Sequence, residues 1–281
     1  EGIDGLLGLT VRLFAGPGDT VVTSAGAYPT FNYHVAGFGA RLVTVPYRDD
    51  AEDPEALATA ARAEGARLVY LSNPDNPMGS MLAPERIAAL LDALPKGCLL
   101  CLDEAYGEFA PADMLLSLDA ADPRLIRFRT FSKAHGLAGL RLGYAIAAPA
   151  TAAAFDRVRN HFGVNRMAQA AGLAALADTE HLDRVITATA ESRAEIARIA
   201  AANGLTALPS ATNFVAVDCG GGGAFARAVL NGLLARDVFV RMPGIAPLDR
   251  CIRIGAGTPQ DLAFLAEMLP AALAEARAAV A

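Results

Sequence analysis

Tryptophan is absent from this 281-residue sequence, and cysteine occurs only four times. The cysteines (Cys98, Cys101, Cys219 and Cys251) lack the spacing of a disulfide framework, which predicts a reducing, cytoplasmic environment. Cys98 and Cys101 form a C-x-x-C pair inside the apolar run C-L-L-C-L, which is typical of a buried strand. Residues three apart on a strand point to opposite faces, so this pair is a poor candidate for a zinc or thioredoxin-type site.

Long apolar runs and basic clusters are also absent. No run approaches the roughly 20 residues of a membrane-spanning helix, and no signal peptide is recognisable. The net charge is −6, so we expect binding neither to nucleic acid nor to membranes. Apolar residues make up 53% of the chain, which is enough for one large or two smaller cores. A helical pattern is already under way at Glu1, so we expect further residues upstream.

Helix and strand patterns alternate through the first half of the chain. Apolar spacing predicts helices over 1–14, about 29–37, 54–64 and 84–94, and strands over 20–24, 41–45, 67–71, 98–102, 125–129 and 142–147. Continuous apolar strands separated by helices indicate an α/β domain with a largely parallel, buried sheet. Ligands bind at the carboxyl ends of such strands. The polar motifs discussed below follow these strands, as that rule requires.

The second half of the chain predicts a different organisation. Helices are expected over 152–162, 166–177 and 181–203, followed by the order β-α-β-β-α with strands over 213–218, 238–241 and 251–254 and helices over 225–236 and 260 to about 277. We therefore expect a large domain over residues 1–160. Linking helices and a smaller C-terminal α+β domain are expected over 161–281.

The most informative segment is T-F-S-K-A-H-G-L-A-G-L-R-L-G-Y, residues 130–144. Lys133 lies between the hydroxyl residues Thr130 and Ser132, and Arg141 follows eight positions later. A lysine amine acts as a covalent catalyst by forming a Schiff base with a carbonyl. Hydroxyls and a guanidinium are suitable donors around a phosphate. An aldehyde together with a phosphate describes pyridoxal 5'-phosphate, although a lone lysine in a loop is more often simply solvated.

This segment resembles the cofactor-lysine motif of the fold-type I, pyridoxal-phosphate-dependent aminotransferases of class I/II. It is most similar to the histidinol-phosphate aminotransferase form, S-K-x-x-G-L-A-G-L-R-x-G-Y. The resemblance implies a large domain with a mainly parallel seven-stranded sheet, a small C-terminal domain, and a homodimer with active sites at its interface. It also implies that Lys133 holds the cofactor covalently. A glycine-containing turn that completes the phosphate site in this family would lie upstream of Glu1.

Two further motifs fit the same resemblance. Asn73–Gly79 is similar to N-P-x-N-P-T-G, with Met78 in place of threonine, and this implies that Asn76 donates to the cofactor's phenolic oxygen and faces the substrate. In D-E-A-Y, Asp103 corresponds to the carboxylate that favours a protonated pyridine nitrogen, and Tyr106 to a second donor for the phenolic oxygen. Taken alone, the first motif is a rigid turn and the second a solvated loop acid.

Three more residues are candidates by resemblance. Phe31 follows Pro-Thr, where the family has an aromatic ring that stacks on the cofactor; an ordinary core aromatic is the alternative. Arg253, in I-R-I-G, matches the arginine that holds the α-carboxyl or equivalent end of the substrate. Arg241 matches a second arginine, associated with the substrate phosphate. A guanidinium beside an apolar strand needs an anion, and for both an internal salt bridge is the alternative.

The resemblance implies an aminotransferase that moves an amino group from a substrate of the histidinol phosphate or aromatic amino acid type to a 2-oxo acid such as 2-oxoglutarate. Lys133 would act as general base and acid. A decarboxylase of the threonine-phosphate type, or a C–S lyase, shares these motifs and remains the alternative. A ligand-sensing domain, such as the effector half of a transcriptional regulator, is a third interpretation. Retention of the whole residue set argues against the third.

Overall fold

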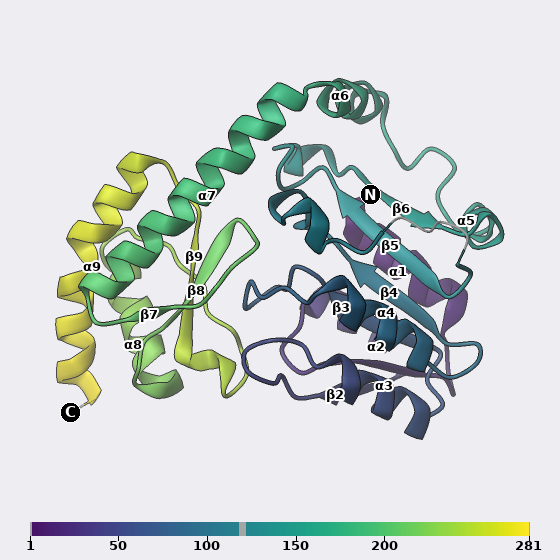
Figure 1. The fold of residues 1–281 in the computed structure, drawn as a ribbon, viewed down its shortest axis with the longest axis horizontal. Helices are drawn as coiled ribbons and strands as arrows, with labels where there is room; N and C mark the ends of the chain where they lie inside the picture. Colours follow the sequence, from purple (N-terminus) through teal and green to yellow (C-terminus); the bar gives the residue numbers. More distant parts are fainter. Residues whose placement is uncertain (1, 118–121, 281) are drawn as a thin grey trace.

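The computed structural model describes residues 2–117 and 122–280 and contains two sheets in this part of the chain (Figure 1). The larger sheet has the order β2-β1-β3-β4-β5-β6. Its strands are β1 (Thr20–Ser24), β2 (Arg41–Val45), β3 (Leu68–Ser72), β4 (Leu99–Asp103), β5 (Leu125–Thr130) and β6 (Gly143–Ala147). All neighbours are parallel except β6, which runs antiparallel to β5. The α/β class with a mainly parallel sheet is confirmed.

The described residues give this sheet six strands, which corrects the expected count of seven. β2 forms one edge and β6 the other. The remaining strands, β7 (Thr206–Ala207), β8 (Phe214–Asp218) and β9 (Cys251–Gly255), pair only with one another. The residues described therefore supply no further strand for either edge of the larger sheet.

Helices cover both faces of the larger sheet and create two separate cores. α1 (Gly2–Phe14), α2 (Pro29–Gly37) and α5 (Pro149–Phe155) pack on one face, and α3 (Pro54–Ala63) and α4 (Pro84–Ala93) pack on the other. Proline occupies the first turn of α2, α3 and α4, where its missing N–H has no cost. Cys98, just before β4, and Cys101, on β4, belong to different cores, as expected for residues three apart in extended chain.

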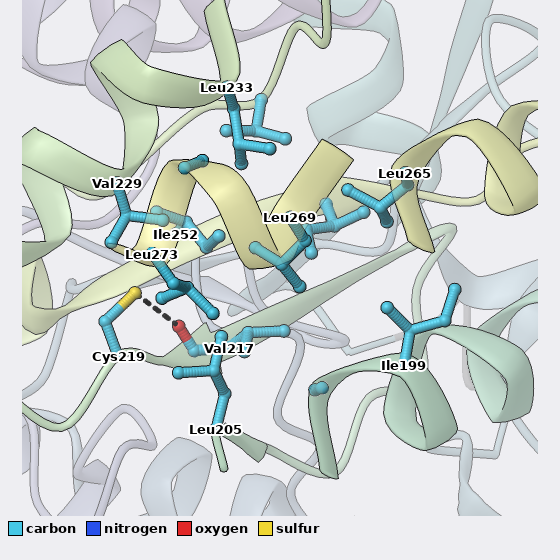
Figure 2. Close-up of a cluster of buried hydrophobic side chains, with 14 of the residues drawn as sticks. Ile199, Leu205, Val217, Cys219, Val229, Leu233, Ile252, Leu265, Leu269 and Leu273 are labelled. Atoms are coloured by element: carbon cyan, nitrogen blue, oxygen red, sulfur yellow. Dashed lines mark hydrogen bonds between the residues drawn. The ribbon is translucent and has the colours of Figure 1, made fainter. Parts of the chain in front are cut away.

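The C-terminal part has its own antiparallel sheet and its own core. α6 (Arg166–Ala177) leads into the long helix α7 (Thr179–Ala202), which runs towards the small sheet (Figure 1). α8 (Gly222–Leu234), α9 (Pro259–Val280) and α7 pack with β8 and β9 around aliphatic side chains that include Val217, Ile252 and Leu269 (Figure 2). The division of the chain at residue 160 stays a prediction.

Two local expectations in this half are wrong. Residues 238–241 form no strand; only Arg241 makes an isolated bridge, to Arg253 on β9. The helix expected over 152–162 ends at Phe155, because the following residues are mostly exposed and bury no apolar stripe that would extend it. None of the helices within residues 2–117 and 122–280 is both long and apolar enough to cross a membrane.

Candidate active site

A cavity lies where β3, β4 and β5 end, and α1 and the start of α2 border it. Its lining includes most of the residues that the sequence predicted: Asn76, Asp103, Tyr106, Thr130, Ser132, Lys133 and Arg141. The strand register explains why they meet. Ser72 on β3 pairs with Asp103 on β4, and Asp103 lies within the register of β5, so the loops that follow these strands share one edge of the sheet.

Asp103 is the buried acid of this cavity, with 3% of its surface exposed. The Tyr70 hydroxyl donates to Oδ2 at 2.6 Å, and the Ala105 N–H donates to Oδ1 at 2.9 Å. Burial raises the pKa of Asp103 to about 6, and these two hydrogen bonds oppose the rise. No ion pair to Asp103 is present within the described ranges. Its charge therefore remains available to a group bound in the cavity.

Lys133 projects from the loop after β5, with its Nζ 5.3 Å from the centre of the Tyr106 ring. Burial lowers the pKa of Lys133, and Arg253 lowers it further, while Asp103 acts in the opposite direction. A lower pKa increases the fraction of neutral amine, the form that attacks a carbonyl or accepts a proton. The loop turns at Gly136, whose φ of 68° favours glycine.

The hydroxyl and guanidinium donors line the same cavity. The Thr130 Oγ1 accepts from the Ser132 N–H at 3.1 Å. Arg141 adopts a left-handed backbone conformation (φ 51°), which is costly for a residue other than glycine and typical of functional positions. Its guanidinium reaches Asp4 at 3.4 Å and is half exposed, so it can still bind a further anion.

Arg253 lies beside the cavity and not in its lining. It donates to Asn76 Oδ1 and stacks on Phe214, with the guanidinium carbon 4.6 Å from the ring centre. Burial lowers the pKa of Arg253. In the part of the chain that the structure describes, no carboxylate forms an ion pair with it, so the salt-bridge alternative has no support there. Arg253 is thus a partly buried cation in need of an anion.

Arg241 is exposed and joins Arg253 through backbone hydrogen bonds of 3.1 and 2.6 Å. Its guanidinium carbon lies 5.4 Å from the centre of the Phe239 ring. The positive charge of Arg241 lowers the pKa of Arg253. Arg241 does not line the cavity itself.

Phe31 is not brought to the cavity. Its side chain projects from α2 into the core between that helix, α1 and the sheet, where it is completely buried and stacks on Tyr70 with ring centres 4.5 Å apart. Tyr28, which the sequence reasoning missed, lines the cavity instead and donates to Asp4 Oδ1 at 3.0 Å. The signal was present in A-Y-P-T-F, because Pro29 begins α2 and Tyr28 is therefore the last residue of the preceding turn.

Met78 also lies away from the cavity lining. Its side chain is 1% exposed and packs with Ala216, Leu248 and Cys251 of the C-terminal part. Within the N-P-D-N-P-M-G turn, Asn76 thus faces the cavity and Met78 packs against the C-terminal part. The substitution of methionine for the motif's threonine adds contact between the two parts of the chain.

The donor set of the cavity fits pyridoxal 5'-phosphate. An amine with a lowered pKa suits its aldehyde, a buried carboxylate suits its ring nitrogen, and an amide and a phenol suit its phenolic oxygen. Two hydroxyls and a guanidinium suit its phosphate. The aromatic ring of Tyr28 borders the same space. Each functional group of the cofactor therefore has a chemically matched side chain.

Comparison with known proteins agrees with this donor set. Residues 1–269 match the family model described as aminotransferase class I and II. Histidinol-phosphate aminotransferase 2 of Ralstonia nicotianae is 39% identical over 282 residues, covering 99% of this chain and 75% of that protein. The crystal structure of histidinol-phosphate aminotransferase from Sinorhizobium meliloti in complex with pyridoxal-5'-phosphate has a TM-score of 0.95 and 56% identity, covering 98% of this chain and 76% of that one.

A more distant match shows how far the fold extends. L-threonine-O-3-phosphate decarboxylase from Porphyromonas gingivalis has a TM-score of 0.78 at 20% identity, which is a likeness of fold alone. The family match covers nearly the whole chain, and relatives at 38–39% identity are named as histidinol-phosphate aminotransferases. The chain therefore belongs to the class I and II aminotransferase family, whose cofactor is pyridoxal 5'-phosphate.

Proposed function

We propose that this protein transfers an amino group between an amino substrate of the histidinol phosphate type and a 2-oxo acid such as 2-oxoglutarate. The observation that carries the proposal is that Lys133 and Asp103 line one cavity and that Arg253, which has no ion-pair partner among the described residues, lies beside it. Relatives named as histidinol-phosphate aminotransferases at 34–39% identity support the amino substrate. The matching decarboxylase is far less similar, at 20% identity.

The residues of the cavity divide the binding of the cofactor among them. Asp103 would hold the ring nitrogen, and Asn76 and Tyr106 the phenolic oxygen. Thr130, Ser132 and Arg141 would bind the phosphate as an anion site. When bound, the cofactor supplies a ring that takes up the electrons of the bond broken at the substrate. Asp103 favours the positively charged ring on which that property depends.

Lys133 moves the proton. Its amine would hold the cofactor and, when free, would take up the proton released from the substrate carbon as general base and give it back as general acid. The lowered pKa of Lys133 supports this role, since a general base must be neutral to accept a proton. The centre of the Tyr106 ring lies 5.3 Å from Nζ, and the ring borders the same space.

The two arginines would bind the anionic end of the substrate. Arg253 is partly buried and held by Asn76 and Phe214, so its planar fork is positioned before substrate arrives. Arg241 adds a second charge at the exposed side of the same β9 edge. A carboxylate or a phosphate satisfies this pair equally well in chemical terms. An amino acid and an amino phosphate could therefore bind to the same two arginines, one after the other.

We also propose that the protein acts as a homodimer in the cytoplasm. Large apolar side chains of α2, α6 and the segment between α5 and α6 are exposed, among them Tyr33 at 70%, Phe162 at 97% and Met167 at 74%. Exposure of such a surface to water is unfavourable, and contact with a second copy of the chain would bury it. Light scattering coupled to size-exclusion chromatography measures the assembly directly, and a monomer at micromolar concentration would contradict this part of the proposal.

The test of function is a panel of amino donors with 2-oxoglutarate and pyridoxal 5'-phosphate. The panel contains histidinol phosphate, phenylalanine and phosphothreonine, and Lys133→Ala serves as the inactive control. We expect glutamate to form from 2-oxoglutarate, with histidinol phosphate as the best donor. Carbon dioxide release without any need for a 2-oxo acid would instead establish a decarboxylase. Cofactor binding with no turnover of any donor would favour a ligand-sensing domain.

A further inference from the structure

We propose that Tyr70 is the positioning residue of Asp103, and that Phe31 in turn fixes Tyr70. The hydroxyl of Tyr70 would orient the buried carboxylate towards the cavity and keep it ionised. The inference rests on the proposed function, because the orientation of Asp103 matters for a ring nitrogen bound in the cavity. It also gives Phe31 a role that its distance from the cavity does not reveal.

Strand register brings the two side chains together. Tyr70 pairs with Cys101 and Ser72 pairs with Asp103, so Tyr70 and Asp103 lie diagonally on the same face of neighbouring strands. The hydroxyl reaches Oδ2 at 2.6 Å, and the Ala105 N–H holds Oδ1 at 2.9 Å. One donor on each oxygen fixes the plane of the carboxylate. Removal of the hydroxyl would leave only the backbone donor.

The Tyr70 ring has no freedom to turn away. It is completely buried, and it stacks against Phe31 with ring centres 4.5 Å apart and an angle of 17° between the planes. Phe31 is itself completely buried in the first turn of α2, where Pro29 starts the helix. A stacked pair of buried aromatic rings is a rigid support for the hydroxyl. The contacts from Phe31 to Tyr70 and from Tyr70 to Asp103 therefore connect the core to the cavity.

The electrostatic surroundings make this donor important. The ionisable groups that interact with Asp103 come from every element around it: Asp4 on α1, Tyr28 before α2, Glu52 before α3, Cys101 on β4, Glu104 and Tyr106 after β4, and Lys133 after β5. Burial, Asp4 and Glu104 all raise the pKa of Asp103. The hydrogen bond from Tyr70 is the largest influence that lowers it.

The experiment compares Tyr70→Phe with Tyr47→Phe. Tyr47 is a matched control, because its hydroxyl donates to another buried carboxylate, Asp75, at 2.9 Å and neither residue lines the cavity. Carbon-13 NMR of labelled aspartate in the cofactor-free protein follows the titration of Asp103. We expect Tyr70→Phe to raise the pKa of Asp103 by about one unit or more, the equivalent of one hydrogen bond to a charged group. Tyr47→Phe should leave it unchanged.

A second measurement is the equilibrium dissociation constant of pyridoxal 5'-phosphate. Tyr70→Phe should weaken binding about fivefold or more near pH 6 and less near pH 8, where Asp103 ionises even without the hydroxyl. Phe31→Leu, which loosens the ring support, should shift both measurements in the same direction by less. An unchanged Asp103 titration in Tyr70→Phe overturns the inference. Failure of the unaltered protein to bind the cofactor, with the titration shifted as expected, contradicts the proposed function and leaves the positioning of Asp103 supported.

Discussion

Asp103 and Glu104 are consecutive residues at the end of β4, and both are almost completely buried, at 3% and 1% exposure. Asp103 accepts hydrogen bonds from a tyrosine and a backbone N–H and faces the cavity. Glu104 faces Arg127, with contacts of 2.6 and 2.9 Å, and Arg129, at 2.9 Å. Arg127 is itself 1% exposed. Glu104 is thus neutralised within the fold, whereas Asp103 is not.

The difference shows that burial alone does not identify a functional acid. A carboxylate enclosed by its own arginines has no remaining charge to offer a ligand, and its value lies in the stability of the sheet. A carboxylate held by neutral donors keeps its charge for whatever binds beside it. The presence or absence of an internal cation therefore separates the structural acid from the functional one.

Removing the structural acid should have the largest effect on folding. We expect Glu104→Gln to lower the free energy of unfolding by about 3–5 kcal/mol, because Arg127 would be left buried without its counter-charge. Urea denaturation measures this directly. Glu64→Gln is the control, since the exposed pair of Glu64 with Arg41 should contribute no more than about 1 kcal/mol. Equal losses in the two variants would contradict the structural role of Glu104.

Removing the functional acid should spare the fold and abolish most of the activity. We expect Asp103→Asn to reduce turnover by about 10²–10³-fold, comparable to the loss of one preorganised electrostatic group, or about 3–4 kcal/mol. The amide keeps the shape of the side chain and loses its charge. Steady-state kinetics with saturating cofactor is the measurement. If Asp103→Asn keeps most of the activity, the electrostatic role of Asp103 is wrong.

The same substitution should change how stability depends on pH. The pKa of Asp103 is raised from 3.8 to about 6 in the folded protein. The folded state therefore retains a proton that the unfolded state has released, and stability falls as pH rises from about 4 to about 6. The full loss is about 2–3 kcal/mol. The difference in unfolding free energy between Asp103→Asn and the unaltered, cofactor-free protein should grow across that range and then level off; a flat difference would contradict the raised pKa.

Asn76 and Met78 form a similar pair within one turn, since the first lines the cavity and the second is buried in packing. Met78 packs against the C-terminal part, so Met78→Thr should lower the free energy of unfolding by about 1–3 kcal/mol through lost burial. The activity at saturating substrate should change less than twofold, because the side chain does not line the cavity. Thermal unfolding and kinetics of the same preparation separate the two effects. A large fall in activity with unchanged stability would contradict this prediction and show that Met78 acts in the active site.

Much of the fold and most of the site could be predicted from the sequence. β1 and β2 were predicted with their observed bounds, since β-branched residues between turn signals are a strong local pattern. Asn76, Asp103 and Lys133 meet at one edge because parallel strands end together, a rule that needs no side-chain coordinates. The roles proposed for individual residues remain predictions until they are tested.

The errors come from features that depend on packing. The sequence could not separate Tyr28 from Phe31, because both are aromatic residues near Pro29 and only the first-turn geometry of α2 sends one ring to the cavity and the other to Tyr70. It could not show that Met78 contacts residues about 140 to 170 positions later in the chain. Residues 238–241 have the apolar pattern of a strand. In the structure only Arg241 pairs, through an isolated bridge to Arg253 on β9, the edge strand of the small sheet. Non-local contacts decided each case.

The identity of the amine that holds the cofactor tests the central claim most directly. The protein is incubated with pyridoxal 5'-phosphate, reduced with borohydride to make the attachment permanent, and digested for mass spectrometry. We expect a single modified lysine, Lys133, with none at Lys96, the only other lysine in the sequence. Modification that is absent from Lys133, or spread over other amines to the same extent, would contradict the placement of the active site beside Asp103.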